Sequence, residues 1–330
     1  MKLILHIGMG KTGTSSIQKT LNHRKEDLAS QNTQYLGMWF DILNPEYQGY
    51  LGMRQFMQSD ETNMKAAGQR FVELLKVRAD TQGIDTFILS NEALFANVQN
   101  ITPFLRVVQQ NVDLKIIAYI RDPHEWLPSA FTQWGLFHKQ QKGPLKRFSE
   151  LAPTLIGQYE GIRYWISDFR DVLTVRKHDT SINVVEDFAK VCGIKMERSD
   201  KRHLERSEPA ETLLRAAFNA HFDNEVMPER FDKILLDRKT GVPHLDDLIS
   251  LSFEYDGIEG IVKERQDLFE FIRDNCGEEF DFLVGNPNVK TMPDASELRQ
   301  RLFDFMMEIT ISQSIRIKRL EKLVYELRSN

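Results

Sequence analysis

One segment near the amino terminus, residues 3–16 (LILHIGMGKTGTSS), constrains the fold more than any other part of the chain. The apolar run Leu3–Ile7 is typical of a buried strand, and three glycines interrupt the short loop that follows it. Thr14–Ser16 then opens a helical pattern. A strand that leads through a glycine-rich loop into a helix gathers N–H groups and the positive end of a helix dipole at one place. The segment therefore predicts a site for a phosphate-like anion, and Lys11 adds a positive charge to it.

This loop differs from the Walker A loop that binds ATP. Gly8 and Gly13 have the Walker spacing, but Thr14 stands where the motif has lysine, and Lys11 lies before the second glycine. A kinase would lack the residue that reaches its terminal phosphates. No apolar strand ends in an aspartate placed for a Walker B role. We expect a phosphate-binding loop that serves chemistry other than ordinary Mg·ATP turnover.

Composition narrows the class of protein. Of the 330 residues, 41% are hydrophobic and 28% charged, as in a soluble globular protein. The net charge of −5 argues against broad nucleic-acid binding. No apolar run is long enough to span a membrane, and the first strand starts too early to follow a signal peptide. Cys192 and Cys276 suggest buried thiols rather than a disulfide framework. These features together predict a cytoplasmic protein.

Strand and helix patterns alternate over the first two thirds of the chain. Such alternation implies crossover connections and a parallel sheet that helices cover on both faces. The expected strands are Leu3–Ile7, Thr86–Ser90, Leu114–Ile120 and Val172–Arg176. The expected helices are Thr14–Ser30, Met64–Ala79, Ile101–Gln110, Pro123–Gln140, Ser181–Cys192 with Gly193 as its C-cap, and one that Ser207 would cap and Pro209 would open.

The fold class predicted is α/β, with a P-loop-type parallel sheet flanked by helices and a mainly helical C-terminal part. We divide the chain into an α/β domain over residues 1–222 and a helical extension over 223–330, which could equally form one domain. The final stretch, Asp294–Arg328, is charged and periodic. We expect its first half to pack on its own domain, and its last fifteen residues are candidates for a homodimer contact.

A second anion-binding constellation follows the strand Leu114–Ile120. Arg121 stands at the carboxyl end of this strand, where open α/β sheets bind their ligands, and Ser129 follows eight residues later. A guanidinium and a hydroxyl could hold a second phosphate between them. Taken alone, this motif favours an Arg121 that pairs with Asp122 or caps a helix and a Ser129 on the surface. Taken together with the first loop, a second anion pocket is the better explanation.

These two motifs resemble those of sulfotransferases that use 3′-phosphoadenosine 5′-phosphosulfate (PAPS). The loop motif of that family stands here as Lys11-Thr12-Gly13-Thr14-Ser15, preceded by Gly10 and followed by Ser16. The second motif, Arg-Asp-Pro with a serine eight residues after the arginine, stands as Arg121, Asp122, Pro123 and Ser129. The opening segment is similar to bacterial members thought to sulfate carbohydrates or other small acceptors. The resemblance covers residues 1–135 best and fades beyond 219.

The resemblance implies a mechanism. Gly10 to Ser16 would hold the 5′-phosphosulfate, Lys11 would neutralise the leaving phosphate, and Arg121 with Ser129 would hold the 3′-phosphate. No metal is required. Glu92, which follows the strand Thr86–Ser90, would be the base that takes the acceptor proton, although it could equally cap the next helix. His6 is expected to be a core or sheet-edge residue, but its place beside the loop keeps it as a rival base. His23 and His124 are further rivals that are expected to be surface residues.

Several features depart from the family or leave alternatives open. Ser16 stands where the cytosolic branch often has tryptophan, and the family's glycine-rich C-terminal nucleotide loop is missing, unless the basic run Lys201–Ser207 replaces it. The aromatic region Tyr35–Phe56 is either an acceptor-binding lid or a loop packed on the core. An atypical P-loop kinase and a non-catalytic nucleotide-binding scaffold remain as competing functions.

Overall fold

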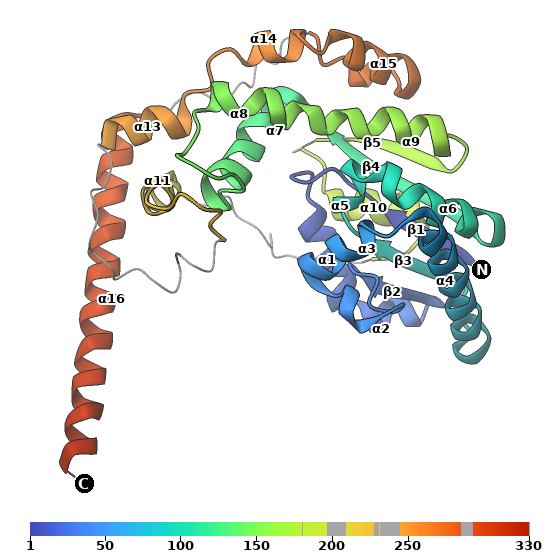
Figure 1. Ribbon diagram of the computed structural model, residues 1–330, viewed down its shortest axis with the longest axis horizontal. Helices are drawn as coiled ribbons and strands as arrows, with labels where there is room; N and C mark the ends of the chain where they lie inside the picture. Colours follow the sequence, from blue (N-terminus) through green and yellow to red (C-terminus); the bar gives the residue numbers. More distant parts are fainter. Residues whose placement is uncertain (180, 197–208, 228–230, 232–244, 285–292, 330) are drawn as a thin grey trace. The chain divides into compact units, whose positions relative to one another are not determined.

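A computed structural model describes residues 1–179, 181–196, 209–227, 231, 245–284 and 293–329 (Figure 1). The described chain forms two compact units. The first contains Met1–Trp126, Thr154–Glu205 and Glu259–Asn288, and the second contains Leu127–Pro153, Arg206–Ile258 and Val289–Asn330. Both units are discontinuous in sequence, so no single cut, at residue 222 or elsewhere, separates them. In the described part of the chain, no helix has the length and apolar character needed to cross a membrane.

The first unit is built on a five-stranded sheet in which all strands run parallel. The strands lie in the order β2-β3-β1-β4-β5. Their bounds are β1 Lys2–His6, β2 Thr33–Gly37, β3 Thr86–Ser90, β4 Asp113–Arg121 and β5 Leu173–His178. The α/β class and the parallel sheet predicted from the sequence are confirmed.

Helices connect the strands. The helices that lie wholly or partly in the first unit and precede β4 are α1 (Thr14–His23), α2 (Lys25–Ala29), η1 (Pro45–Tyr47), α3 (Gly49–Met57), α4 (Glu61–Gln82), α5 (Ala93–Ala96) and α6 (Val98–Asn111). Those that follow β4 are α7 (Pro123–Ala130), η3 (Ile156–Glu160), α9 (Gly161–Phe169), α10 (Val184–Cys192), α14 (Ile258–Lys263), α15 (Gln266–Cys276) and η4 (Glu278–Phe280). The second unit holds the π-helical turn η2 (Phe131–Phe137), most of α8 (Phe148–Leu155), α11 (Pro209–Ala220), α13 (Leu245–Phe253) and α16 (Ala295–Ser329). The chain passes from one unit to the other within α7.

One face of the sheet packs against α1, α2 and α10. Apolar side chains of the strands and these helices form one buried cluster, which includes Ile4, Ile88, Ile117, Tyr119, Ile17, Leu21, Leu28 and Phe188. On the other side, α4 and α6 pack along each other (Figure 1) and share a group of packed aromatic rings with the segment after β2. That group contains Phe40, Phe56, Phe71 and Phe104.

The strand order creates a switch point between β1 and β4. From β1 the chain moves outward across β3 to β2, whereas from β4 it moves in the opposite direction to β5. Right-handed crossovers place these two connections on opposite faces of the sheet. Open parallel sheets bind ligands in the crevice that this arrangement leaves at the carboxyl ends of the strands. The two predicted anion motifs follow β1 and β4, the two strands that flank this crevice.

The expected helices agree with the structure except in detail. The pattern Thr14–Ser30 is two helices, because the backbone of Arg24 leaves helical geometry and separates α1 from α2. The pattern Pro123–Gln140 is α7 followed by η2. Helix α11 begins at Pro209 as expected, whereas its expected cap Ser207 lies outside the described residues.

Candidate functional site

The loop between β1 and α1, residues 7–13, has the backbone of an anion-binding nest. Lys11 and Gly13 both have positive φ, 69° and 82°, and Gly13 is the N-cap of α1. Alternating backbone handedness of this kind curls successive N–H groups around a concave space. The first turn of α1 carries no acidic residue, so nothing in it offsets the positive end of the helix dipole. A Cβ on Gly13 would lie 2.7 Å from a methyl group of Val184, so glycine serves both the turn and the close packing of α10.

Three successive carbonyl groups of this loop are bound by side-chain donors. The Thr12 hydroxyl donates to the Met9 carbonyl at 2.5 Å, and the Trp126 indole donates to the Gly10 carbonyl at 2.7 Å. The Arg121 guanidinium donates to the Lys11 carbonyl at 3.4 Å. A trans peptide points its N–H away from its carbonyl, so the N–H groups of residues 10–12 are directed away from these donors. The loop is thereby held in place through its carbonyl groups.

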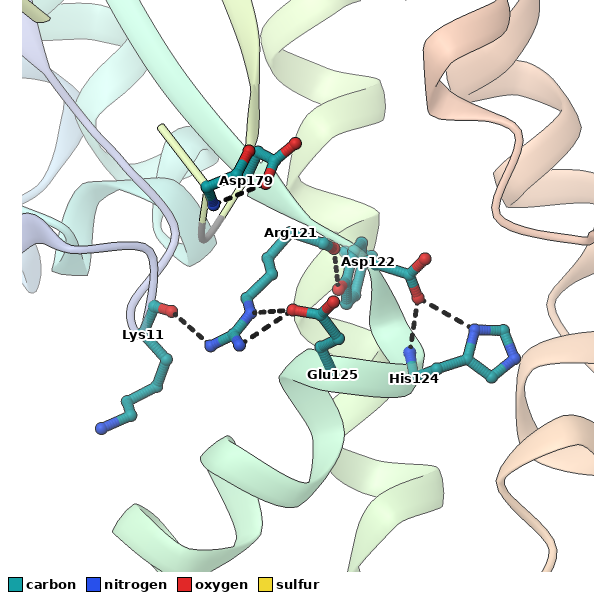
Figure 2. A network of polar contacts seen from close by, with 8 residues as sticks. Lys11, Arg121, Asp122, His124, Glu125 and Asp179 are labelled. Atoms are coloured by element: carbon teal, nitrogen blue, oxygen red, sulfur yellow. Dashed lines mark hydrogen bonds and ion pairs between the residues drawn. The ribbon is translucent and has the colours of Figure 1, made fainter. Parts of the chain in front are cut away.

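Arg121 connects this loop to α7 (Figure 2). It ends β4 and is only 5% exposed, and its Nε and Nη2 donate to one carboxylate oxygen of Glu125 at 3.2 and 3.0 Å. The Lys11 carbonyl faces the guanidinium, while the Lys11 side chain extends away from it (Figure 2). Arg121 therefore pairs with Glu125, four residues along, rather than with Asp122. Three of its five N–H groups are used in these bonds.

Asp122 and Pro123 start α7 as an N-cap and first helical residue, a common helix opening. The Asp122 carboxylate accepts hydrogen bonds from the backbone N–H and the ring Nδ1 of His124, both at 2.9 Å (Figure 2). Burial lowers the pKa of His124, but the Asp122 hydrogen bond and the charges of Asp122 and Glu259 outweigh it and raise the pKa overall. The Nε2 of His124 lies 3.4 Å from Glu259. The expectation that His124 is a surface residue is wrong, because its side chain is fully buried at the start of α7.

The last residue of β5, His178, is the neighbour of Arg121 across the β4–β5 ladder. Burial, and then the charge of Arg121, lower the pKa of His178 to about 4. The imidazole is therefore neutral near pH 7. Positive charge at this edge of the sheet is carried by Arg121 and not by the adjacent histidine.

On the other side of the loop, His6 ends β1 and is completely buried. Its Nδ1 is hydrogen-bonded to the Ser90 hydroxyl at 2.7 Å, and a Cβ on Gly8 would lie 2.6 Å from its Nε2. Burial lowers the pKa of His6 to about 3, so the ring is neutral near pH 7. The lack of a side chain at Gly8 lets the loop pass directly over this ring.

Glu92 follows β3 and is half-buried. It is the N-cap residue of α5, but its carboxylate does not cap the helix, because the Asn91 side chain accepts the Ala93 N–H instead. One carboxylate oxygen of Glu92 accepts a hydrogen bond of 2.7 Å from Gln18 of α1. Burial, and then the charge of Glu92, raise the pKa of Tyr35 in β2. The helix-cap alternative for Glu92 is thus not what the structure shows.

The remaining candidates are placed as follows. Thr14 is buried, and Ser15 and Ser16 are half-buried in the first turn of α1. His23 lies at the far end of α1, where its Nδ1 contacts the Lys19 carbonyl. Ser129 belongs to the second unit, and its phosphate role stays a prediction. The basic run Lys201–Ser207 lies outside the described residues, within which no three His, Cys, Asp or Glu side chains form a group that could hold a metal ion.

The aromatic region Tyr35–Phe56 is divided between core and surface. Tyr35 and Phe40 are buried, and Phe56 packs against Phe40, whereas Tyr50 is 65% exposed. The Asn91 amide, next to Glu92, donates to the Met38 carbonyl in this region. The region is anchored to the core by its first aromatic residues and starts beside the candidate base.

Sequence reasoning missed two residues of the site. Trp126 was overlooked because a tryptophan in an apolar helical pattern is typical of core packing, and it is indeed fully buried. Gln18 is only 7% exposed, next to Ile17 on the buried side of α1. A polar side chain on a buried helix face needs hydrogen-bond partners, and this is the signal that could have identified it. A scan against protein-family models finds no match for the chain, and no curated protein matches it either.

Proposed function

We propose that the chain is a sulfotransferase that transfers a sulfuryl group from PAPS to the hydroxyl group of an acceptor, a carbohydrate or another small molecule. The observation that carries the proposal is the loop after β1, which has a nest-type backbone with three bound carbonyl groups and lies at the switch point of the sheet. The backbone N–H groups of such a nest, the start of α1 and the charge of Lys11 suit a phosphate ester. The absence of lysine at the Walker position favours a donor other than Mg·ATP.

The proposed reaction is an in-line displacement. The acceptor oxygen attacks sulfur and forms a new S–O bond, while the S–O bond to the 5′-phosphate breaks and its electron pair leaves with adenosine 3′,5′-bisphosphate. Glu92 takes the proton of the acceptor hydroxyl. Lys11 neutralises charge on the departing phosphate, so its contribution grows toward the transition state. Positioning and charge neutralisation, with no covalent intermediate, account for such transfers.

Arg121 is proposed to bind the 3′-phosphate. Two features of Arg121 support this role. It lies at the end of β4, and its bonds to Glu125 and Lys11 do not use all of its N–H groups, so that others could bind a phosphate. The same bonds also give Arg121 a second task, since they order the loop that would hold the 5′-phosphate.

A cytoplasmic location is part of the proposal. It is supported by Cys192 and Cys276, which are both free thiols. Burial raises the pKa of Cys192 to about 12, so this thiol is unreactive near pH 7.

Calorimetric titration of the purified protein tests the function. Adenosine 3′,5′-bisphosphate should bind without metal and far more tightly than AMP, because only the former carries the 3′-phosphate. In Arg121→Ala this advantage over AMP should vanish. If the substitution weakened both nucleotides equally, Arg121 would act only by ordering the loop.

Two outcomes would overturn the proposal. A preference for Mg·ATP over adenosine 3′,5′-bisphosphate would favour the atypical kinase. Tight nucleotide binding in a protein whose cellular role survives Glu92→Gln would favour the scaffold.

A further inference from the structure

Gln18 of α1 is hydrogen-bonded to the end of β3 and to the Glu92 carboxylate that follows it. Its Nε2 donates to the Glu92 carboxylate at 2.7 Å and to the Ser90 carbonyl at 3.2 Å. Both neighbours are acceptors, so the NH2 group of the amide must face them and the side chain has one orientation. Gln18 is 7% exposed and therefore cannot readily exchange these partners for water.

Gln18 also belongs to α1, the helix that starts at the predicted phosphate-binding loop. We call this loop, residues 7–13, and the first turn of α1 the anion cradle. It lies four residues after Thr14, about 6 Å along α1 from the first turn. One rigid helix thus presents its N-terminus to the phosphate-like group and, one turn later, an amide to the carboxylate after β3. The spacing between the two is set by helix geometry and not by a loop.

The residue before Glu92 links the end of β3 to the segment after β2. The Asn91 amide donates to the Met38 carbonyl at 2.7 Å. The backbone that carries Glu92 therefore lies beside the segment in which the aromatic region begins. A base at this place would be close to an acceptor held by that region.

We infer that Gln18 is a positioning residue that holds the Glu92 carboxylate in register with the anion cradle of α1, an inference that rests on the proposed function for its catalytic meaning. The amide donates to the charged form of the carboxylate and fixes its direction. Proper placement of a base typically matters by roughly a hundredfold in rate. Turnover in Gln18→Met should fall by up to this factor, with binding of adenosine 3′,5′-bisphosphate unchanged.

The decisive experiment needs no acceptor. The chemical shift of the Glu92 carboxyl carbon is measured at pH 7 by ¹³C NMR in selectively labelled protein, with Glu92→Gln used to assign the signal. Gln18→Met keeps the side-chain length but removes the donor, so this chemical shift should change, because the carboxylate loses the hydrogen bond that orients it. Gln18→Glu should change it as well, because it replaces the donor by a second carboxylate.

Asn22→Ala is the matched control, since Asn22 lies one turn farther along α1 and is exposed. It should leave the chemical shift of the Glu92 carboxyl carbon unchanged. A Glu92 chemical shift that stays the same in folded Gln18→Met and Gln18→Glu would overturn the inference, even if adenosine 3′,5′-bisphosphate binds normally. Failure of that nucleotide to bind the wild-type protein would instead overturn the proposed function and leave the Gln18–Glu92 contact standing.

Discussion

At the scale of single residues, the site depends on buried polar groups whose charge state is set by their surroundings. His6 is buried, is bound to Ser90 and has aromatic neighbours in Tyr119 and Phe188. Its depressed pKa, about 3, means that the folded protein holds this ring neutral under conditions in which the unfolded chain protonates it. Folding stability is therefore linked to pH through a residue that directly precedes the β1–α1 loop.

The sign of this linkage gives a prediction. Below pH 6.5 the unfolded chain binds a proton at His6 and the folded protein does not, so the stabilisation present above this pH is lost progressively down to about pH 3. Between pH 7 and pH 5 the loss should be ~2 kcal/mol. His178 titrates in the same direction, so the test compares urea unfolding of the wild type with His6→Asn, which keeps a partner for Ser90. Equal pH slopes in the two proteins would show that His6 is not held neutral.

At the scale of secondary-structure elements, α7 holds the β1–α1 loop in place through side-chain hydrogen bonds. The Trp126 indole donates to the Gly10 carbonyl, and the Arg121–Glu125 pair joins the end of β4 to α7. The chain contains a close counterpart in Trp165 of α9, which is equally buried and donates to the Phe95 carbonyl at 3.0 Å. The two tryptophans make the same kind of bond, but only one of them touches the loop.

Substitutions of Trp126 and Trp165 distinguish an effect on folding stability from an effect on nucleotide binding. Trp126→Phe and Trp165→Phe each remove one indole donor, and each should lower the free energy of unfolding by about 1–3 kcal/mol. Only Trp126→Phe should weaken adenosine 3′,5′-bisphosphate binding, by roughly tenfold, because the loop loses a fixed carbonyl and its N–H groups lose their alignment. Calorimetry and thermal unfolding of both variants check this. Equal affinities in the two variants would mean that α7 does not order the loop.

Elements with a continuous apolar pattern could be predicted from the sequence, and one without it could not. β3 was predicted with its observed bounds, because Thr86–Ser90 lies inside the sheet and is apolar on both faces. β2 (Thr33–Gly37) was missed, since it is an edge strand with a partner on one side only and a register shift after Tyr35. Its sequence, Thr-Gln-Tyr-Leu-Gly, has two polar residues and a glycine and therefore resembles a loop.

The residues of the candidate site likewise divide into those that the sequence predicts and those that it does not. Lys11, Gly13, Arg121 and Glu92 could be found because each stands at a strand end or in a loop, where spacing along the chain carries the information. The contacts between Gln18 and Glu92 and between Trp126 and Gly10 join residues 74 and 116 positions apart. No local pattern reports such pairs, because they arise only when strands from distant parts of the chain pair in register.

At the scale of the whole molecule, α16 leaves a large apolar surface uncovered. Its first turns are packed, since Leu298 and Leu302 are buried and the helix contacts α11 within the second unit (Figure 1). Farther along, Met306, Ile317 and Leu320 are about half exposed or more. Together with Ile309 and Gln313, these residues form one stripe whose 3- and 4-residue spacing is the same in both directions from Gln313.

This symmetry predicts an antiparallel dimer through α16. In two antiparallel copies centred on Gln313, Met306 would meet Leu320 and Ile309 would meet Ile317, each pair occurring twice, as a two-fold interface requires. Analytical ultracentrifugation should find a dimer for the wild type and a monomer for Leu320→Glu, because the carboxylate enters both copies of an apolar pair. Ile311→Glu is the matched control: Ile311 is similarly exposed, at 55%, but lies on the opposite side of the helix, so the dimer should persist. A monomeric wild type at tens of micromolar, or equal effects of the two substitutions, would contradict pairing through this stripe.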